Sequence, residues 1–150
     1  RPAVNLGRSV SRVGGAGQTK AMKNAVGSSR IDLAQYREME VCTQFSSDLD
    51  EATKAQLTYG SCLMERLKQP LCSPLKLHEQ VITLWAATHK AFVHVEPKKI
   101  KQYQKELLEY FDNVYPEVGR EINESKQLSD ELGEKILQIA EEFRSRSAAE

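Results

Sequence analysis

Apolar side chains recur at helical spacing through most of the chain, from residue 31 to residue 146. Three sets of positions each fall on one face of a helix: Leu77, Val81, Leu84, Thr88, Phe92 and Val95; Ile100, Tyr103, Leu107, Phe111 and Val114; and Leu132, Ile136, Ile139, Ala140 and Phe143. A less regular fourth set comprises Leu49, Ala52, Gln56, Leu57, Leu63 and Leu67. The pattern predicts a mainly α-helical protein whose helices pack as a compact bundle.

Serine and proline stand before the predicted helices at positions where they would stabilise a helix start. Ser47 and Ser129 are each followed by acidic residues, which favour the positive end of the helix dipole. Ser73 is followed by Pro74, and Pro97 precedes the next apolar set. Proline is tolerated in the first helical turn because its missing N–H would lack a partner there. These signals predict four helix starts separated by short connections.

Glycine divides the sequence into two parts. Four glycines lie in residues 1–17, namely Gly7, Gly14, Gly15 and Gly17. They prevent a long regular element, so we expect a glycine-rich strand or loop there, with residues 2–7 as a candidate short strand and helix from Gln18 onward. Gly60 and Gly133 instead fall inside predicted helices, where each costs about 1 kcal/mol relative to alanine. Gly60 is compatible with either close helix packing or a bend.

Charge is also distributed unevenly along the chain. The net charge of the 150 residues is zero, but residues 1–30 hold six basic residues and no acid. Such a segment is typical either of a solvated basic tail or of a contact with an anionic partner. Over the whole chain, 40% apolar and 28% charged residues are the proportions of a soluble globular protein, and no apolar run reaches the roughly 18 residues of a membrane span.

Cysteine and histidine spacings argue against a disulfide framework and against a metal site. The three cysteines, Cys42, Cys62 and Cys72, form no CxxC pair, so reduced and mostly buried thiols are expected. The three histidines, His78, His89 and His94, are spaced eleven and five residues apart. Paired ligands on one helix face need spacings of three or four, so we predict no metal site.

The stretch "SVSRVGGAGQTK", residues 9–20, resembles a phosphate-binding loop but lacks its spacing. A Walker A lysine follows the last glycine directly, whereas Gln18 and Thr19 separate Gly17 from Lys20. We therefore exclude a self-contained nucleotide site. A lone Arg12 among small residues can donate a forked pair of hydrogen bonds to phosphate oxygens bound by another subunit. The alternative is that Arg12 caps carbonyls or makes a surface ion pair.

Four segments resemble one family in order and spacing. "RPAVNLGRSVSRVGGAGQTKAMK", "IDLAQYREME", "QFSSDLDEAT" and "LKQPLCSPLKLHEQV" are similar to the alpha subunit of F-type ATP synthases. The resemblance implies that residues 1–17 are the tail of the nucleotide-binding domain. It also implies that residues 18–150 are the C-terminal helical domain of the ATP synthase alpha/beta type.

The resemblance also implies a role for the glycine-rich stretch. In this family alpha and beta subunits alternate in a hexamer, and alpha completes catalytic sites that lie mainly on beta. Arg12 would then be an arginine finger, with Ser9 shaping its loop and Ser11 helping to orient it. The substrate of the parent complex would be ATP or ADP with magnesium, and no nucleotide is expected to bind tightly to this segment alone.

The helical domain would lie near the rotating central shaft, the gamma subunit. The candidates for shaft-proximal contact are Phe45, Ser46, Ser47, Asp48, Leu49 and Asp50, and ordinary helix capping is the alternative. The parent complex would make ATP using proton or sodium flow. It would be peripheral, on the cytoplasmic face of a bacterial membrane or the equivalent organelle face. We expect no nucleic-acid partner and no membrane insertion, and the isolated segment can be a monomer.

Two other interpretations follow from the residues without the resemblance. One is a free-standing helical interaction module whose basic N-terminal arm binds anions. The other is a nucleic-acid-binding arm on a helical domain, although the arm has no interleaved aromatic residues on which bases could stack.

Overall fold

The computed structural model describes residues 4–5, 9–43 and 50–147, and the regular structure within these ranges is helical. In sequence order the elements are α1 (Arg12–Gly17), α2 (Lys20–Val26), α3 (Ser29–Thr43), α4 (Glu51–Arg66), α5 (Leu77–Thr88), the 3-10 helix η2 (Pro97–Lys99), α6 (Ile100–Val114), α7 (Pro116–Ser125) and α8 (Asp130–Ser147). The predicted mainly α-helical fold is confirmed. Within the described ranges, no helix is both long and apolar enough to cross a membrane.

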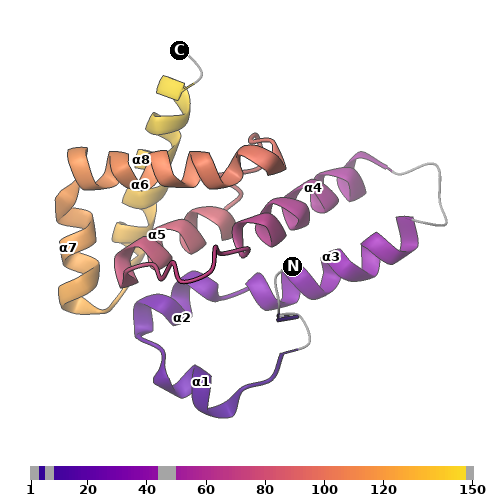
Figure 1. The fold of residues 1–150 in the computed structure, drawn as a ribbon, viewed down its shortest axis with the longest axis horizontal. Helices are drawn as coiled ribbons and strands as arrows, with labels where there is room; N and C mark the ends of the chain where they lie inside the picture. Colours follow the sequence, from indigo (N-terminus) through magenta and orange to yellow (C-terminus); the bar gives the residue numbers. More distant parts are fainter. Residues whose placement is uncertain (1–3, 6–8, 44–49, 148–150) are drawn as a thin grey trace.

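Helix α5 lies at the centre of the helical domain, which we define as α2 to α8 (Figure 1). It packs against α2, α4, α6, α7 and α8. Its side chains Val81, Ile82 and Ala86 are fully buried. The other helices add to the same core with Leu33, Leu63, Leu107, Phe111, Ile122 and Ile136. Burial of apolar surface is the main favourable term in folding, so one shared core holds these helices together.

Gly60 and Gly133, the two glycines predicted to lie inside helices, mark close approaches between helices. A Cβ atom built on Gly60 of α4 would lie 2.2 Å from Cδ2 and 2.6 Å from Cβ of Tyr36, on α3. The alternative of a bend at Gly60 is therefore not needed: glycine lets α3 and α4 pack side by side (Figure 1). Gly133 of α8 is covered in the same way by Trp85 of α5, whose indole N–H donates to the Gly133 carbonyl at 2.9 Å.

Two of the predicted helix starts are confirmed. Pro97 is the first residue of η2, which leads directly into α6. Ser129 immediately precedes α8, and its Oγ accepts a hydrogen bond from the backbone N–H of Leu132 at 3.2 Å. The acidic residues after Ser129 lie in the first turn of α8, where they complement the helix dipole.

The predicted helix start at Ser73 and Pro74 is wrong, because α5 begins at Leu77. Lys76 occupies the N-cap position, and its backbone N–H donates to Oε2 of Glu79 at 2.6 Å. This capping interaction satisfies one backbone donor at the true helix start. The serine and proline lie instead in the connection between α4 and α5.

Helix α5 also ends earlier than its apolar stripe suggests. It stops at Thr88, so Phe92 and Val95 follow the helix rather than extending it. Lys90 has φ 64°, the left-handed conformation that ends helices. Phe92 nevertheless remains 2% exposed and belongs to the core. A turn therefore brings Phe92 to the core without a continued helix.

Helix α7 is an element that the apolar pattern does not predict. It follows α6 after the single residue Tyr115 and begins with Pro116, a favoured first helical residue. Val118 and Ile122 are fully buried on one face of it. Its apolar set is too short to stand out from the sequence, and packing against α5 and α6 supplies its stability.

The cysteines for which a side chain is described are free thiols. Cys62 is buried in α4, whereas Cys72 is exposed in the connection that follows. The expectation of burial is therefore wrong for Cys72. Burial raises the pKa of the Cys62 thiol, which favours its unreactive protonated form.

Candidate functional site

Arg12 is the first residue of the short helix α1, where a strand or loop was expected. Ser11 stands at the N-cap, and its Oγ accepts a hydrogen bond from the N–H of Gly14 at 2.9 Å. A Cβ atom on Gly14 would lie 2.6 Å from that hydroxyl oxygen, so glycine leaves room for the cap. Local capping thus outweighs the poor helix propensity of the glycines. The candidate strand over residues 2–7 lies largely outside the described residues.

The side chain of Arg12 is exposed. Among the described residues it makes no hydrogen bond or ion pair, so the alternative of carbonyl capping or a surface ion pair finds no support there. Ser11 acts on Arg12 indirectly, by starting the helix on which Arg12 stands. Ser9 precedes α1 and is half-buried. The three predicted site residues thus lie close together, at and just before the start of α1.

Helix α1 is connected to the helical domain by only two residues, Gln18 and Thr19. Thr19 caps α2, its Oγ1 accepting from the N–H of Met22 at 3.2 Å. Helix α2 is fixed in turn, because Ala21 is fully buried and its N–H donates to the carbonyl of Lys126 at 3.0 Å. Figure 1 shows α1 below α2 and away from the rest of the helices. Helix α2, which follows the Arg12 segment, is therefore anchored to the rest of the helical domain, while α1 itself buries no residue.

The predicted shaft-contact segment falls largely outside the described residues. Phe45, Ser46, Ser47, Asp48 and Leu49 belong to residues 44–49, which are not described. Asp50 is exposed and occupies the N-cap position of α4, so the predicted helix start at Ser47 is wrong. Helix α3 ends at Thr43 and α4 begins at Glu51 at the same end of their antiparallel pair (Figure 1).

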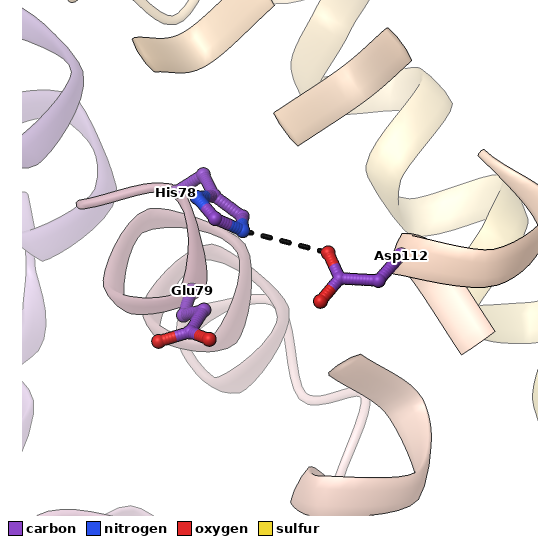
Figure 2. A group of neighbouring side chains, drawn as sticks. All are labelled: His78, Glu79 and Asp112. Carbon is purple, nitrogen blue, oxygen red and sulfur yellow. Dashed lines mark ion pairs between the residues drawn. The ribbon is translucent and has the colours of Figure 1, made fainter. Parts of the chain in front are cut away.

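His78, Glu79 and Asp112 form a cluster that the sequence did not indicate (Figure 2). Their potential ligand atoms lie within 4.8 Å of one another. Nε2 of His78 faces Oδ1 of Asp112 at 3.5 Å, and its Nδ1 faces the amide nitrogen of Asn123 at 3.0 Å. Glu79 accepts the hydrogen bond from Lys76 at the start of α5.

Each member of this cluster therefore already has a protein partner. His78 connects α5 to α6 through Asp112 and to α7 through Asn123. Sequence reasoning missed the cluster because it compared only histidines and cysteines along single helices, whereas Asp112 comes from another helix. The arrangement is best explained as a connection between helices, and the prediction that no metal binds here stays a prediction.

Comparison with known proteins places this chain among subunits of one enzyme complex. The family described as "ATP synthase alpha/beta chain, C terminal domain" matches residues 18–143. Proteins described as "ATP synthase subunit alpha" from Aquifex aeolicus and Clostridium botulinum are 42% and 46% identical over 146 and 145 residues, 97% of this chain in both cases. One from a Mycobacterium species is 47% identical over 144 residues, 96% of this chain.

The chain spans only part of these relatives, 29% of the length of the first two and 26% of the third. The match nevertheless runs along nearly all of its own length. The chain belongs to the family of C-terminal domains of the ATP synthase alpha and beta subunits, and it corresponds to the C-terminal region of the alpha subunit.

Proposed function

We propose that this chain supplies an arginine finger to a nucleotide site on a neighbouring beta subunit and places a helical domain near the central shaft. Arg12 is the finger. The parent complex couples ATP synthesis, or hydrolysis in reverse, to the transport of protons or sodium ions. It lies at the periphery of a membrane, on the cytoplasmic face in bacteria or the equivalent face in organelles. The reacting species is ATP or ADP with magnesium, bound mainly by the neighbour.

The observation that carries the proposal is the free guanidinium of Arg12 at the start of an exposed helix. A side chain that serves another subunit must have no competing partner in its own domain, and Arg12 has none among the described residues. Its guanidinium is planar and permanently charged, and it can donate two parallel hydrogen bonds to phosphate oxygens. It lies on a segment whose base is fixed by the anchored helix α2.

The chemistry expected of Arg12 is electrostatic. During phosphoryl transfer, negative charge spreads over the oxygens of the transferred group, and a positioned guanidinium stabilises that charge. Neither Ser9 nor Ser11 needs to react covalently. The hydroxyl of Ser11 accepts a backbone hydrogen bond at 2.9 Å, which is a structural role. Ser9 would shape the segment that precedes the helix.

The helical domain would transmit rotation of the shaft. The antiparallel pair α3–α4 would act as the lever, and Gly60 lets these two helices pack closely at Tyr36. The connection between these helices, which contains residues 45–50, is the proposed contact with the shaft. A free-standing anion-binding module is the weaker interpretation, because the match to alpha subunits covers 97% of the chain.

The test is steady-state ATP hydrolysis by the assembled complex carrying Arg12→Ala. We expect turnover to fall by roughly 10³ to 10⁵, the range that arginine fingers contribute in other nucleotide hydrolases. Assembly, measured by size-exclusion chromatography, should be unchanged, because α1 buries no residue.

The matched control is Arg30→Ala, which removes an exposed arginine from the same basic segment. It should leave turnover within about a factor of two, since screened surface charges contribute little. Arg12→Lys should retain only a small part of the activity, because an ammonium group cannot donate two parallel hydrogen bonds to phosphate oxygens as a guanidinium does. Equal activity of Arg12→Ala and the control would contradict the proposal.

A further inference from the structure

Arg66 is a charged residue buried without a counter-ion. It lies in the last turn of α4 and is only 4% exposed. No carboxylate of the described residues forms an ion pair with it. A buried charge is normally paired, because transfer of an unpaired ion from water costs several kcal/mol. The position therefore requires an explanation that the core packing does not give.

The guanidinium of Arg66 is only partly satisfied by its neighbours. Its Nη2 donates to Oγ1 of Thr83, a hydroxyl that itself donates to the carbonyl of Glu79 at 2.6 Å. Nε is buried and has no acceptor among the described residues. Burial lowers the pKa of this group to about 10, so it is still charged at neutral pH. Nε is thus a buried donor without an acceptor, and the charge of Arg66 has no counter-ion among the described residues.

Arg66 lines a cavity of about 400 Å³ between α4, α5 and α6. The wall includes the apolar residues Leu75 and Leu108 as well as Lys101. Lys101 has no ion pair among the described residues. Ligand cavities commonly combine apolar walls with a few polar groups that fix orientation, and this cavity has that composition.

The acidic residues of the cavity wall are already engaged. Glu109 pairs with Lys105 at 3.7 Å, and Asp112 faces His78 at 3.5 Å. Glu79 accepts a backbone hydrogen bond at the start of α5. Among the basic residues of the cavity wall, Lys68 and Lys105 have ion pairs, whereas Arg66 and Lys101 have none among the described residues.

We propose that this cavity binds a small organic carboxylate, with its carboxylate on Arg66 and its apolar body against Leu75 and Leu108. A single negative charge suits the site better than a doubly charged phosphate, because three carboxylates also line the wall. An arginine can donate two parallel hydrogen bonds to a carboxylate through its terminal nitrogens, and the bound carboxylate would be the counter-ion that Arg66 lacks. This site is separate from Arg12 and independent of the proposed finger.

Titration calorimetry on the assembled complex, with its nucleotide sites filled by MgADP, tests this site. Benzoate is the probe, benzamide is its neutral isostere, and phenyl phosphate is its doubly charged counterpart. We expect saturable binding of benzoate, binding at least tenfold weaker for benzamide, and weaker binding of phenyl phosphate than of benzoate. Absence of saturable benzoate binding, or equal or tighter binding of either analogue, would overturn the proposal.

Variants then assign the binding to this cavity. Arg66→Leu should weaken benzoate binding at least tenfold while keeping or raising the thermal midpoint, since it removes an unpaired buried charge. Arg66→Lys keeps the charge and is the alternative variant if Arg66→Leu does not fold. It should also weaken benzoate binding, because an ammonium group cannot donate the two parallel hydrogen bonds of a guanidinium. Lys98→Ala, an exposed lysine outside the cavity wall, is the control and should bind like the unaltered complex. Unchanged binding in both Arg66 variants would contradict the assignment.

Discussion

Helix α1 and the helical domain that follows it differ in the burial of their side chains. Helix α1 has no buried residue, and Val13 within it is 83% exposed. Helix α5, at the centre of the domain, has Val81, Ile82 and Ala86 fully buried. The exposed helix carries Arg12, the side chain proposed to act on a neighbour. The side chain proposed to act on a neighbour therefore lies outside the core that holds its own domain together.

This division predicts that substitutions in the two regions fail in different ways. Changes in α2 to α8 should lower the free energy of unfolding. Changes in α1 should leave that free energy nearly unchanged and alter only what happens at the neighbouring site. Pairs of matched substitutions, one in each region, test the division.

The largest stability difference is expected between Phe111→Ala and Val13→Ala. Phe111 is 1% exposed, so its truncation leaves a cavity and should cost about 3–5 kcal/mol. Val13→Ala removes an exposed side chain and should change stability by less than about 0.5 kcal/mol. Chemical denaturation of the full-length protein measures both. Similar losses from the two variants would remove the distinction between the regions.

The second pair is Gly60→Ala and Gly15→Ala. A methyl group at Gly60 would meet the ring and Cβ of Tyr36, so α3 and α4 must separate, at a cost of about 1–3 kcal/mol. At Gly15 nothing lies within 4 Å of the added atom, and alanine should favour α1 slightly. Thermal unfolding should show a lower midpoint for the first variant only. A Gly60→Ala protein as stable as the parent would mean that the helices are not in close contact there.

The third prediction concerns alkaline pH. Tyr59 donates to Asp32 at 2.8 Å; burial, and then this hydrogen bond, raises the pKa of the phenol. Burial also raises the pKa of Tyr103 to about 12. Both phenols are thus held neutral in the folded state, whereas in the unfolded state a tyrosine ionises near pH ~10.

The stability that these tyrosines contribute is therefore complete below about pH 10 and is lost as pH rises from there toward 12. Tyr103→Phe should reduce this alkaline loss with little effect at pH 7, because its hydroxyl has no hydrogen-bond partner among the described residues. Arg12→Ala in α1 should leave the profile unchanged. Urea unfolding at pH values between 7 and 11 measures how the free energy of unfolding depends on pH in each variant. An identical pH dependence for Tyr103→Phe and the parent would refute the role of this phenol.

The smallest expected effect comes from removing a serine N-cap, which occurs at the start of both α8 and α1. Ser129→Ala removes the acceptor for the Leu132 N–H at the start of α8 and should cost about 1 kcal/mol. Ser11→Ala removes the acceptor for the Gly14 N–H but should leave global stability unchanged, because α1 buries nothing. Its effect should instead be a loss of helix in α1 and a lower turnover. A stability loss as large as that of Ser129→Ala would show that α1 is part of the core.

The helical fold could be predicted from the sequence because apolar period and helix caps are local signals. Pro97 and Ser129 precede helices, as expected. The start at Pro74 was misplaced because a serine–proline pair resembles a helix start, whereas Lys76 and Glu79 form the actual cap. Helix α7 was missed because short apolar sets are weak signals, and packing decides them. Gly60 illustrates the limit well, since the sequence allowed two roles and only the position of Tyr36 chooses between them.

The candidate sites divide in the same way. Arg12 could be predicted as a site residue because its motif is contiguous in the sequence. Helix α1, which begins at Arg12, was not expected. Arg66 and the His78–Asp112 pair could not be selected, because their partners come from helices distant in the sequence. An arginine in the last turn of a helix is typical of dipole-complementing surface charge, and only burial distinguishes it.

The central claim is that the guanidinium of Arg12 acts on a nucleotide bound by the neighbouring subunit. Chemical rescue of the Arg12→Ala complex by millimolar guanidinium ion tests it most directly, with ATP turnover and nucleotide affinity measured together. The proposal predicts near-normal affinity, severely reduced turnover, and partial recovery of turnover on adding guanidinium, with no such stimulation of Arg30→Ala. Near-normal turnover of the assembled Arg12→Ala complex without guanidinium would contradict it.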